Sequence, residues 1–73
     1  MILESYHNER KFIIREDKPE VGFYLYIFEN EKCVADYLQN DLETCKRFAL
    51  DRYDVPLRSW REISNQSEMP PFL

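Results

Sequence analysis

The sequence predicts a small α+β domain, in which three or four antiparallel strands form a meander sheet and one helix covers one face of that sheet. Short apolar and β-branched runs separated by polar turn residues fill the first half of the chain. A later stretch has apolar residues at helical spacing, and 73 residues leave room for a single core. We expect the domain to occupy residues 1–63, and residues 64–73, which contain Pro-Pro and no periodicity, to form a flexible C-terminal tail.

The strands are expected in two hairpins joined by a four-residue loop at residues 17–20, which would set Ile14 opposite Phe23 and Phe12 opposite Leu25. The runs MILESY and KFIIRE are predicted to pair through a tight turn at Asn8 and Glu9, and the runs GFYLYIF and CVADY through a tight turn at Asn30 and Glu31. The chain has a single glycine, so asparagine has to supply the positive φ angles that such turns need.

The helix is expected to begin near Asn40 and to end near Tyr53. Asn40 followed by Glu43 is a capping-box variant, and Asp54 can end the helix in the left-handed conformation. One apolar stripe runs along the helix, with a further leucine just before it on the same projection: Leu38, Leu42, Cys45, Ala49 and Tyr53. The following segment LRSWREI fits a helical turn and a short strand equally well.

Side chains alternate along a strand, so the hairpin registers sort them onto two faces of the sheet. The face that the helix covers is expected to carry Leu3, Phe12, Ile14, Phe23, Leu25, Ile27 and Val34. The opposite face is expected to carry Tyr6, Lys11, Ile13, Arg15, Tyr24, Tyr26, Phe28, Cys33, Ala35 and Tyr37. This sorting also puts Asp36 on the core face, unless the strand has ended there or the carboxylate reaches Asn40 at the helix start.

No second helix is predicted to cover the opposite face, which we call the second face, and an exposed aromatic patch usually marks an interaction site. We predict a non-enzymatic protein-interaction module, with a homodimer as one form of it, that binds through Tyr24, Tyr26, Phe28 and Tyr37 with Lys11 and Arg15 beside them. One alternative is single-stranded nucleic-acid binding by the same face. Another is a regulatory or immunity-type inhibitor that uses the acidic helix face, and a third is a face covered by the C-terminal segment through Trp60 or Phe72.

The residues give no support for an enzyme, a metal or a cofactor. Cys33 and Cys45 are expected to be reduced and to lie on opposite sides of the sheet, and His7 lies in an expected turn with no partner for catalysis. The net charge of -4 works against non-specific nucleic-acid binding.

No membrane association is expected, because the longest apolar run, Phe23 to Phe28, is far too short to cross a bilayer, and we expect a cytoplasmic protein. Residues 22–60 combine an aromatic strand, a polar turn, a DxLQ segment at Asp36, Leu38 and Gln39, a helix, and a VPxxxW ending that runs from Val55 to Trp60. This block resembles a set of small bacterial proteins of unassigned function. The resemblance implies a bacterial cytoplasmic origin and no particular activity.

Overall fold

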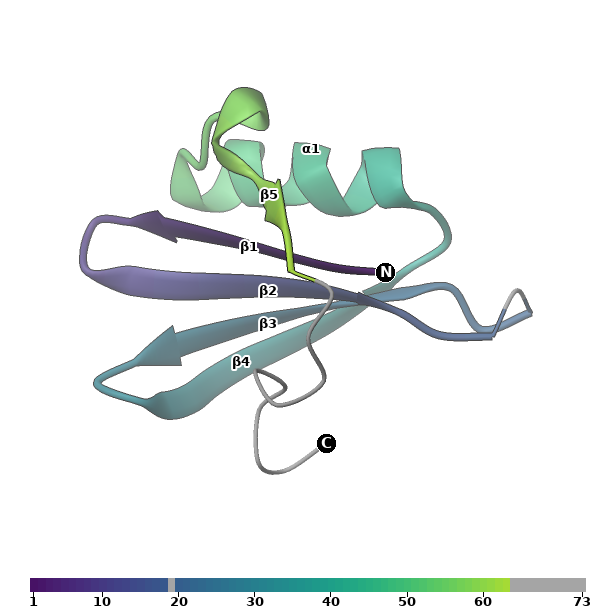
Figure 1. The fold of residues 1–73 in the computed structure, drawn as a ribbon, viewed down its shortest axis with the longest axis horizontal. Coiled ribbons are helices and arrows are strands. Elements are labelled where there is room, and N and C mark those ends of the chain that lie inside the picture. Colours follow the sequence, from purple (N-terminus) through teal and green to yellow (C-terminus); the bar gives the residue numbers. More distant parts are fainter. Residues whose placement is uncertain (19, 64–73) are drawn as a thin grey trace.

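The computed structural model describes residues 1–18 and 20–63 and has five antiparallel strands in one open sheet with one α-helix on it (Figure 1). The strand order is β4-β3-β2-β1-β5, so the first four strands form the expected meander and the α+β prediction is confirmed. The elements are β1 (Ile2–His7), β2 (Arg10–Glu16), β3 (Phe23–Glu29), β4 (Lys32–Gln39), α1 (Leu42–Tyr53), the 3₁₀ helix η1 (Leu57–Ser59) and β5 (Arg61–Glu62).

Both tight hairpin turns form where the sequence predicts them. Asn8 and Glu9 have φ angles of 51° and 64°, and Asn30 and Glu31 have φ angles of 53° and 67°. Two consecutive positive φ angles are the mark of the type I′ turn, whose twist matches that of the flanking strands. Glutamate therefore occupies, in each turn, a position that favours glycine.

The turn between β2 and β3 is longer than expected, because it runs from Asp17 to Gly22. The register moves by two residues as a result, so that Ile14 lies opposite Leu25 instead of Phe23, and Phe12 lies opposite Ile27 instead of Leu25. A shift of two residues keeps every side chain on its face. The expected sorting of β1, β2 and β3 is therefore correct.

The sorting of β4 is wrong beyond Cys33, and a β-bulge is the reason. Phe28 lies opposite Cys33, but Ile27 lies opposite Ala35, so Val34 is the extra residue. One inserted residue moves every later side chain to the other face. Tyr37 and Ala35 consequently pack against the core cluster under the helix, while Val34, expected in the core, is 52% exposed.

The bulge also accounts for the acid that the sequence places in the core. Asp36 lies opposite Tyr26 and is therefore on the second face, where it is exposed to solvent. Leu38 lies opposite Tyr24 on the same face, in β4 and not on the helix stripe. Both residues avoid the core because of the single extra residue upstream.

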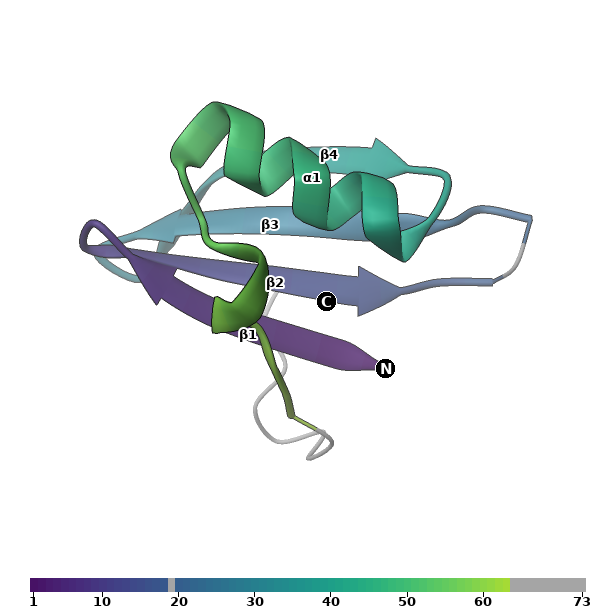
Figure 2. The same cartoon turned by 90° about the horizontal axis from the view of Figure 1, so that it is seen from above.

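The helix begins one residue later than the capping-box pattern predicts. Asp41, not Asn40, is the N-cap, and its Oδ1 accepts a hydrogen bond of 2.8 Å from the backbone N–H of Thr44. At the other end Asp54 adopts the expected left-handed conformation, its N–H donates to the carbonyl of Leu50, and the N–H of Val55 donates to the carbonyl of Ala49. Figure 2 shows α1 lying over β3 and β4, with the η1 segment over the β1 side of the sheet.

The core under α1 is built from the side chains that alternation predicts, with helix residues small enough to approach the sheet. Its buried members are Leu3, Phe12, Ile14, Leu25, Ile27, Cys45, Ala49 and Val55, and the partly buried side chains packed against it include Phe23, Tyr37, Phe48, Tyr53 and Trp60. Phe48, which lies outside the predicted stripe, contacts Tyr37 with ring centroids 4.5 Å apart.

The segment after the helix contains both structures that its sequence fits. Residues 57–59 form η1, and Arg61 and Glu62 form β5, which pairs with Glu4 and Leu3 at the edge of β1. The expected tail at residues 64–73 lies outside the described residues. Within the described part of the chain, no helix is long and apolar enough to cross a membrane.

Candidate interaction surface

The second face consists of three rows of side chains that run across the sheet. The pairings place in one row Ile2, Arg15, Tyr24 and Leu38, in the next Arg61, Glu4, Ile13, Tyr26 and Asp36, and in the last Tyr6, Lys11, Phe28 and Cys33. Of the six residues that the sequence assigns to a binding site, five lie on this face, and Tyr37 lies on the other.

The centre of the second face is buried, which corrects the expectation of an open aromatic surface. Tyr26 is 5% exposed and Phe28 is 8% exposed, and they form an apolar cluster with Ile13 and Ile63. Tyr24 is partly buried against this cluster and stacks on Tyr26 with ring centroids 5.8 Å apart. Burial raises the pKa of Tyr26, and the nearby Arg15 partly offsets that rise.

The margins of the second face remain accessible. At the β1 margin Tyr6 is exposed, and the Lys11 ammonium lies 5.9 Å from the centroid of its ring. At the β4 margin Leu38 is 50% exposed beside the partly buried Tyr24. Among residues 1–18 and 20–63, neither margin holds several stacked rings that face solvent.

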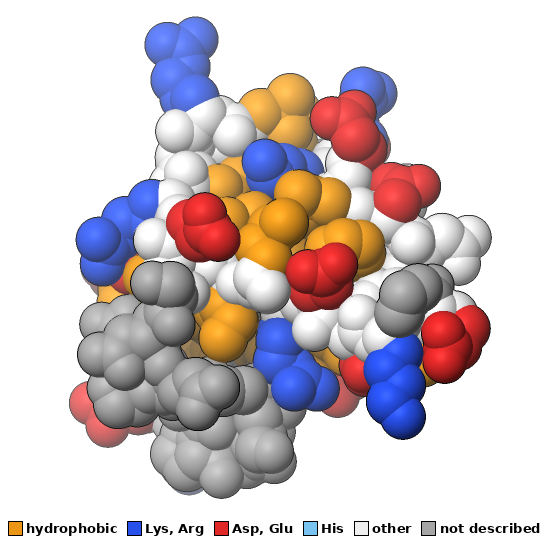
Figure 3. Space-filling view, turned by 45° about the vertical axis from the view of Figure 1, so that its right-hand side comes forward, with side chains coloured by type: hydrophobic (Ala, Val, Ile, Leu, Met, Phe, Trp, Pro, Cys, Tyr) orange, Lys and Arg blue, Asp and Glu red, His pale blue; other side chains and the backbone are white. Residues whose placement is uncertain are grey.

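The edge strand β4 is the longest exposed element of the sheet. Within the described residues it ends the sheet on its side, and Lys32, Cys33, Val34, Asp36 and Leu38 are all exposed. A different side of the molecule is turned towards the viewer in Figure 3, where an apolar patch lies between acidic and basic side chains.

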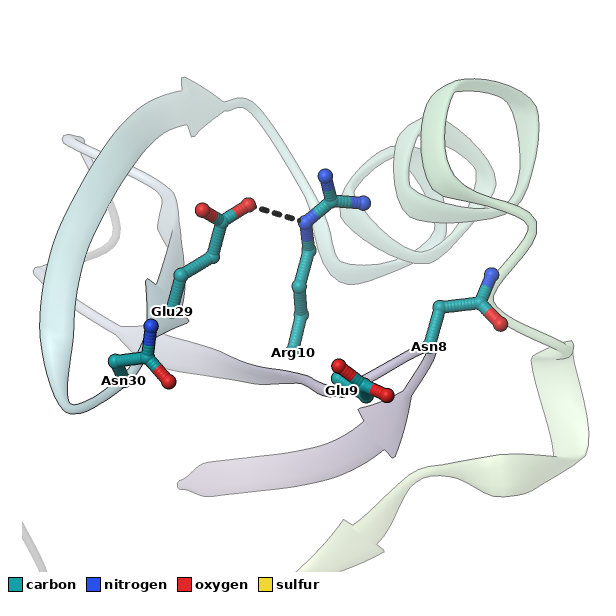
Figure 4. A pocket seen from close by; sticks show the side chains of 5 residues that line it. All are labelled: Asn8, Glu9, Arg10, Glu29 and Asn30. Atoms are coloured by element: carbon teal, nitrogen blue, oxygen red, sulfur yellow. Dashed lines mark hydrogen bonds and ion pairs between the residues drawn. The ribbon is translucent and has the colours of Figure 1, made fainter.

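The two type I′ turns lie at the same end of the sheet and enclose a polar pocket (Figure 4). Its lining consists of Asn8, Glu9, Arg10, Glu29 and Asn30. The Arg10 Nε donates a hydrogen bond of 2.6 Å to Glu29 Oε2, and that bond raises the pKa of the guanidinium. The bond joins the start of β2 to the end of β3, so we interpret it as a structural ion pair.

The thiols and the histidine do not come together. Cys45 lies on the face of α1 that packs on the sheet, and burial there raises the pKa of its thiol to about 11. Cys33 is exposed on β4. His7 is the last residue of β1 and pairs with Arg10, so it lies in the strand and not in the turn. Within residues 1–18 and 20–63, no group of three His, Cys, Asp or Glu side chains could hold a metal ion.

Neither a known protein family, nor a curated protein, nor a solved structure matches this chain. The resemblance to small bacterial proteins stays a prediction, and function has to be argued from the surface itself.

Three features of this surface lie outside the sequence prediction. The sequence predicts Leu38 on the helix stripe and Val34 in the core, whereas both lie exposed on β4. The contact between Glu4 and Arg61 was not predicted at all, although an acid inside an apolar strand and an Arg-x-Ile pattern near the end of the domain are readable signals.

Proposed function

We propose that this protein is a non-enzymatic interaction module that forms a homodimer by pairing the β4 strands of two copies. The observation that carries the proposal is the edge itself. β4 is eight residues long and contains neither proline nor glycine, and within the described part of the chain no strand lies on its outer side. Such an edge presents unpaired N–H and C=O groups, which another strand can satisfy.

The side chains of β4 favour a second copy of the same chain. Val34 and Leu38 are half-exposed apolar side chains that a partner strand would cover. Lys32 and Asp36 carry opposite charges, so the strand is neutral although the whole chain has a net charge of -4. Two acidic molecules can therefore approach at this edge with less repulsion than over the rest of their surfaces.

Antiparallel pairing of identical strands produces a two-fold symmetric interface. The symmetry axis is perpendicular to the sheet, so both copies of α1 would lie on one side of a continuous sheet. Registers that bring Asp36 opposite the second copy's Asp36 are disfavoured, because like charges directly opposite each other destabilise a strand pair. The contact is small, so we expect a weak, concentration-dependent dimer of the kind that buries less than about 1,200 Å².

We propose the β4 edge as the binding surface instead of the predicted aromatic face, because the rings at the centre of that face are buried. Bases stack on exposed rings, and Tyr26 and Phe28 are almost fully buried, while Asp36 adds a negative charge beside them. Single-stranded nucleic-acid binding is therefore the weaker proposal, and no contact favours the acidic helix face as an inhibitory surface.

Sedimentation equilibrium over a wide concentration range tests the proposal. The wild-type protein should shift from one chain mass towards two as concentration rises. The double variant Val34→Lys with Leu38→Lys should stay monomeric, because it places like charges at the paired edge. Leu57→Lys is the matched control, since Leu57 is equally exposed but lies in η1.

Two results would overturn the dimer: a wild-type protein that stays monomeric throughout, or a double variant that dimerises as well as the wild type. The exposed thiol of Cys33 offers an independent readout, because a short bismaleimide should cross-link two paired β4 strands and should not cross-link the double variant.

A further inference from the structure

The edge of β1 carries a buried carboxylate that is satisfied by an exposed cation. Glu4 is 4% exposed and lies on the second face next to Ile13. Its Oε2 accepts a 2.8 Å hydrogen bond from Arg61 Nε and also contacts Arg61 Nη2, while the Arg61 side chain is 71% exposed. A buried charge without a partner is strongly destabilising, so whatever strand lies beside β1 has to bring a cation to Glu4.

An apolar site lies beside the Glu4 site and is occupied by Ile63, two residues after Arg61. Ile63 donates its backbone N–H to the carbonyl of Ile2 at 2.8 Å, and its side chain is 5% exposed. The side chain belongs to the buried cluster that contains Ile13, Tyr26 and Phe28. Arg61 in β5 therefore contacts Glu4 from the solvent side, and Ile63, directly after β5, is buried in the apolar cluster beside β1.

Few ladder pairs hold the segment that occupies these sites. Within the described residues, β5 has two residues, both exposed, and it pairs with Leu3 and Glu4 out of the six residues of β1, in addition to the Glu4–Arg61 and Ile63–Ile2 bonds. A segment with two ladder pairs at the edge of a sheet opens locally at a much lower free energy than the whole domain. The hydroxyl groups of Ser5 and Ser59, 2.7 Å apart, add one further contact just before it.

We propose that the β1 edge is a binding site for an extended segment of another protein with the pattern Arg, any residue, branched aliphatic residue, and that β5 occupies this site in the free molecule. The segment adds antiparallel to β1, gives its guanidinium to Glu4 and buries its aliphatic side chain against Ile13 and Phe28. The site lies at the opposite edge of the sheet from β4, so it is independent of the dimer proposed above.

The chain's own segment competes with any such partner. A tethered segment has an effective concentration of the order of millimolar, so a short peptide should bind the wild-type protein only weakly. Weakening the tethered copy should reveal the site. A partner strand that pairs with more of β1 than Leu3 and Glu4 would gain ladder bonds that β5 does not make.

The test uses a fluorescent peptide with the sequence of residues 59–64, Ser-Trp-Arg-Glu-Ile-Ser. Fluorescence anisotropy should show that the full-length variant Arg61→Ala with Ile63→Ser binds it at least about tenfold more tightly than the wild-type protein does. A peptide carrying Arg61→Glu should not bind. Adding Glu4→Gln to the variant should weaken binding of the original peptide.

Circular dichroism first checks that the variant is folded. A folded variant that ignores the peptide, or that binds both peptides equally, overturns the proposal. Amide hydrogen exchange on the wild-type protein tests, without any variant, whether β5 leaves its site. The Ile63 N–H should exchange at least about tenfold faster than the amides between β1 and β2, and exchange only at the rate of global unfolding would show that β5 does not leave its site.

The experiments also distinguish binding at the β1 edge from the dimer proposed at β4. A second copy that inserts its own residues 61–63 would produce a dimer that survives the β4 double variant and disappears with Glu4→Gln. That outcome would make the occupant a second copy and would overturn the assignment to another protein.

Discussion

The hydroxyl groups of Tyr37 in β4 and Tyr53 at the end of α1 lie 3.1 Å apart. This hydrogen bond, together with burial, raises the pKa of Tyr53. The Arg10 guanidinium lies 5.7 Å from the centroid of the Tyr53 ring, so the helix end is joined to β2 as well as to β4. Tyr37 takes part only because the bulge at Val34 turns it towards the helix.

Deletion of Val34 should therefore destabilise the protein far more than its substitution. Without the extra residue, Tyr37 and Ala35 would point to the second face, and the helix would lose its contacts with β4. We expect the free energy of unfolding in urea to fall by about 3 kcal/mol or more. Val34→Ala is the control and should change it by less than about 1 kcal/mol, because Val34 is half-exposed. Equal effects of the two changes would contradict the role given to the bulge.

Gly22→Ala should be strongly destabilising. Gly22 has a φ angle of 115°, and a Cβ built there would lie 2.2 Å from the carbonyl oxygen of Gln39. Both the strained backbone and the clash with backbone atoms oppose any side chain, and we expect a loss of about 2 kcal/mol or more in thermal or chemical unfolding. Glu20→Ala, in the same turn and exposed, should leave stability nearly unchanged. An unaltered unfolding midpoint for Gly22→Ala would show that the β2–β3 turn is misplaced.

Glu31→Gly should stabilise the protein. Glu31 has a φ angle of 67° in a type I′ turn, a conformation that costs a side-chain-bearing residue about 1–2 kcal/mol, and glycine escapes that cost while losing some backbone entropy. We expect a net gain of about 0.5–1 kcal/mol, measured as a higher urea midpoint. Arg58→Gly, at an exposed residue of η1 without a positive φ angle, should give no gain. A destabilised Glu31→Gly protein would argue against the type I′ geometry.

The Asp41 cap should make stability depend on pH in the acid range. The hydrogen bond from Thr44 lowers the pKa of Asp41 below its ordinary value of 3.8 in the folded protein. Its contribution is thus complete above pH 3.8 and is lost as pH falls through the lower, folded-state pKa. Asp41→Ala should be less stable than the wild type at neutral pH, and the difference should shrink in strong acid. Asp41→Asn keeps the cap without the charge, so its difference from Asp41→Ala should not follow this pH dependence.

The two cysteines should differ sharply in reactivity. Cys33 is exposed, whereas Cys45 is buried, donates weakly to the carbonyl of Phe23 at 3.6 Å, and has a thiol pKa of about 11. Since the thiolate is the reactive form, a thiol reagent should modify one group per folded chain at pH 8 and both groups in denaturant. Cys33→Ser should leave no rapidly reacting thiol. Rapid modification of Cys45 in the folded protein would mean that the helix leaves the sheet readily.

The local elements could be predicted because their signals are local. Asn8 and Asn30 mark tight turns, the alternation in β1, β2 and β3 sorts side chains correctly even when a turn is two residues longer than expected, and Asp54 ends the helix as its type suggests. The N-cap was misassigned by one residue, because Asn40 and Asp41 are both good caps and only the chain's path out of β4 selects between them.

The surface was decided by contacts between residues distant in the sequence. A bulge leaves no signature in KCVADYLQ, yet one extra residue at Val34 exchanges the faces of Tyr37 and Asp36, because strand periodicity carries a single error to every later position. A two-residue strand is too short to show any period, so the local sequence does not predict that Ile63, directly after β5, packs with Tyr26 and Phe28. The amino-acid sequence by itself determined the two tight turns, the helix and the alternation in the first three strands, while the tertiary structure alone decided which aromatic side chains meet water.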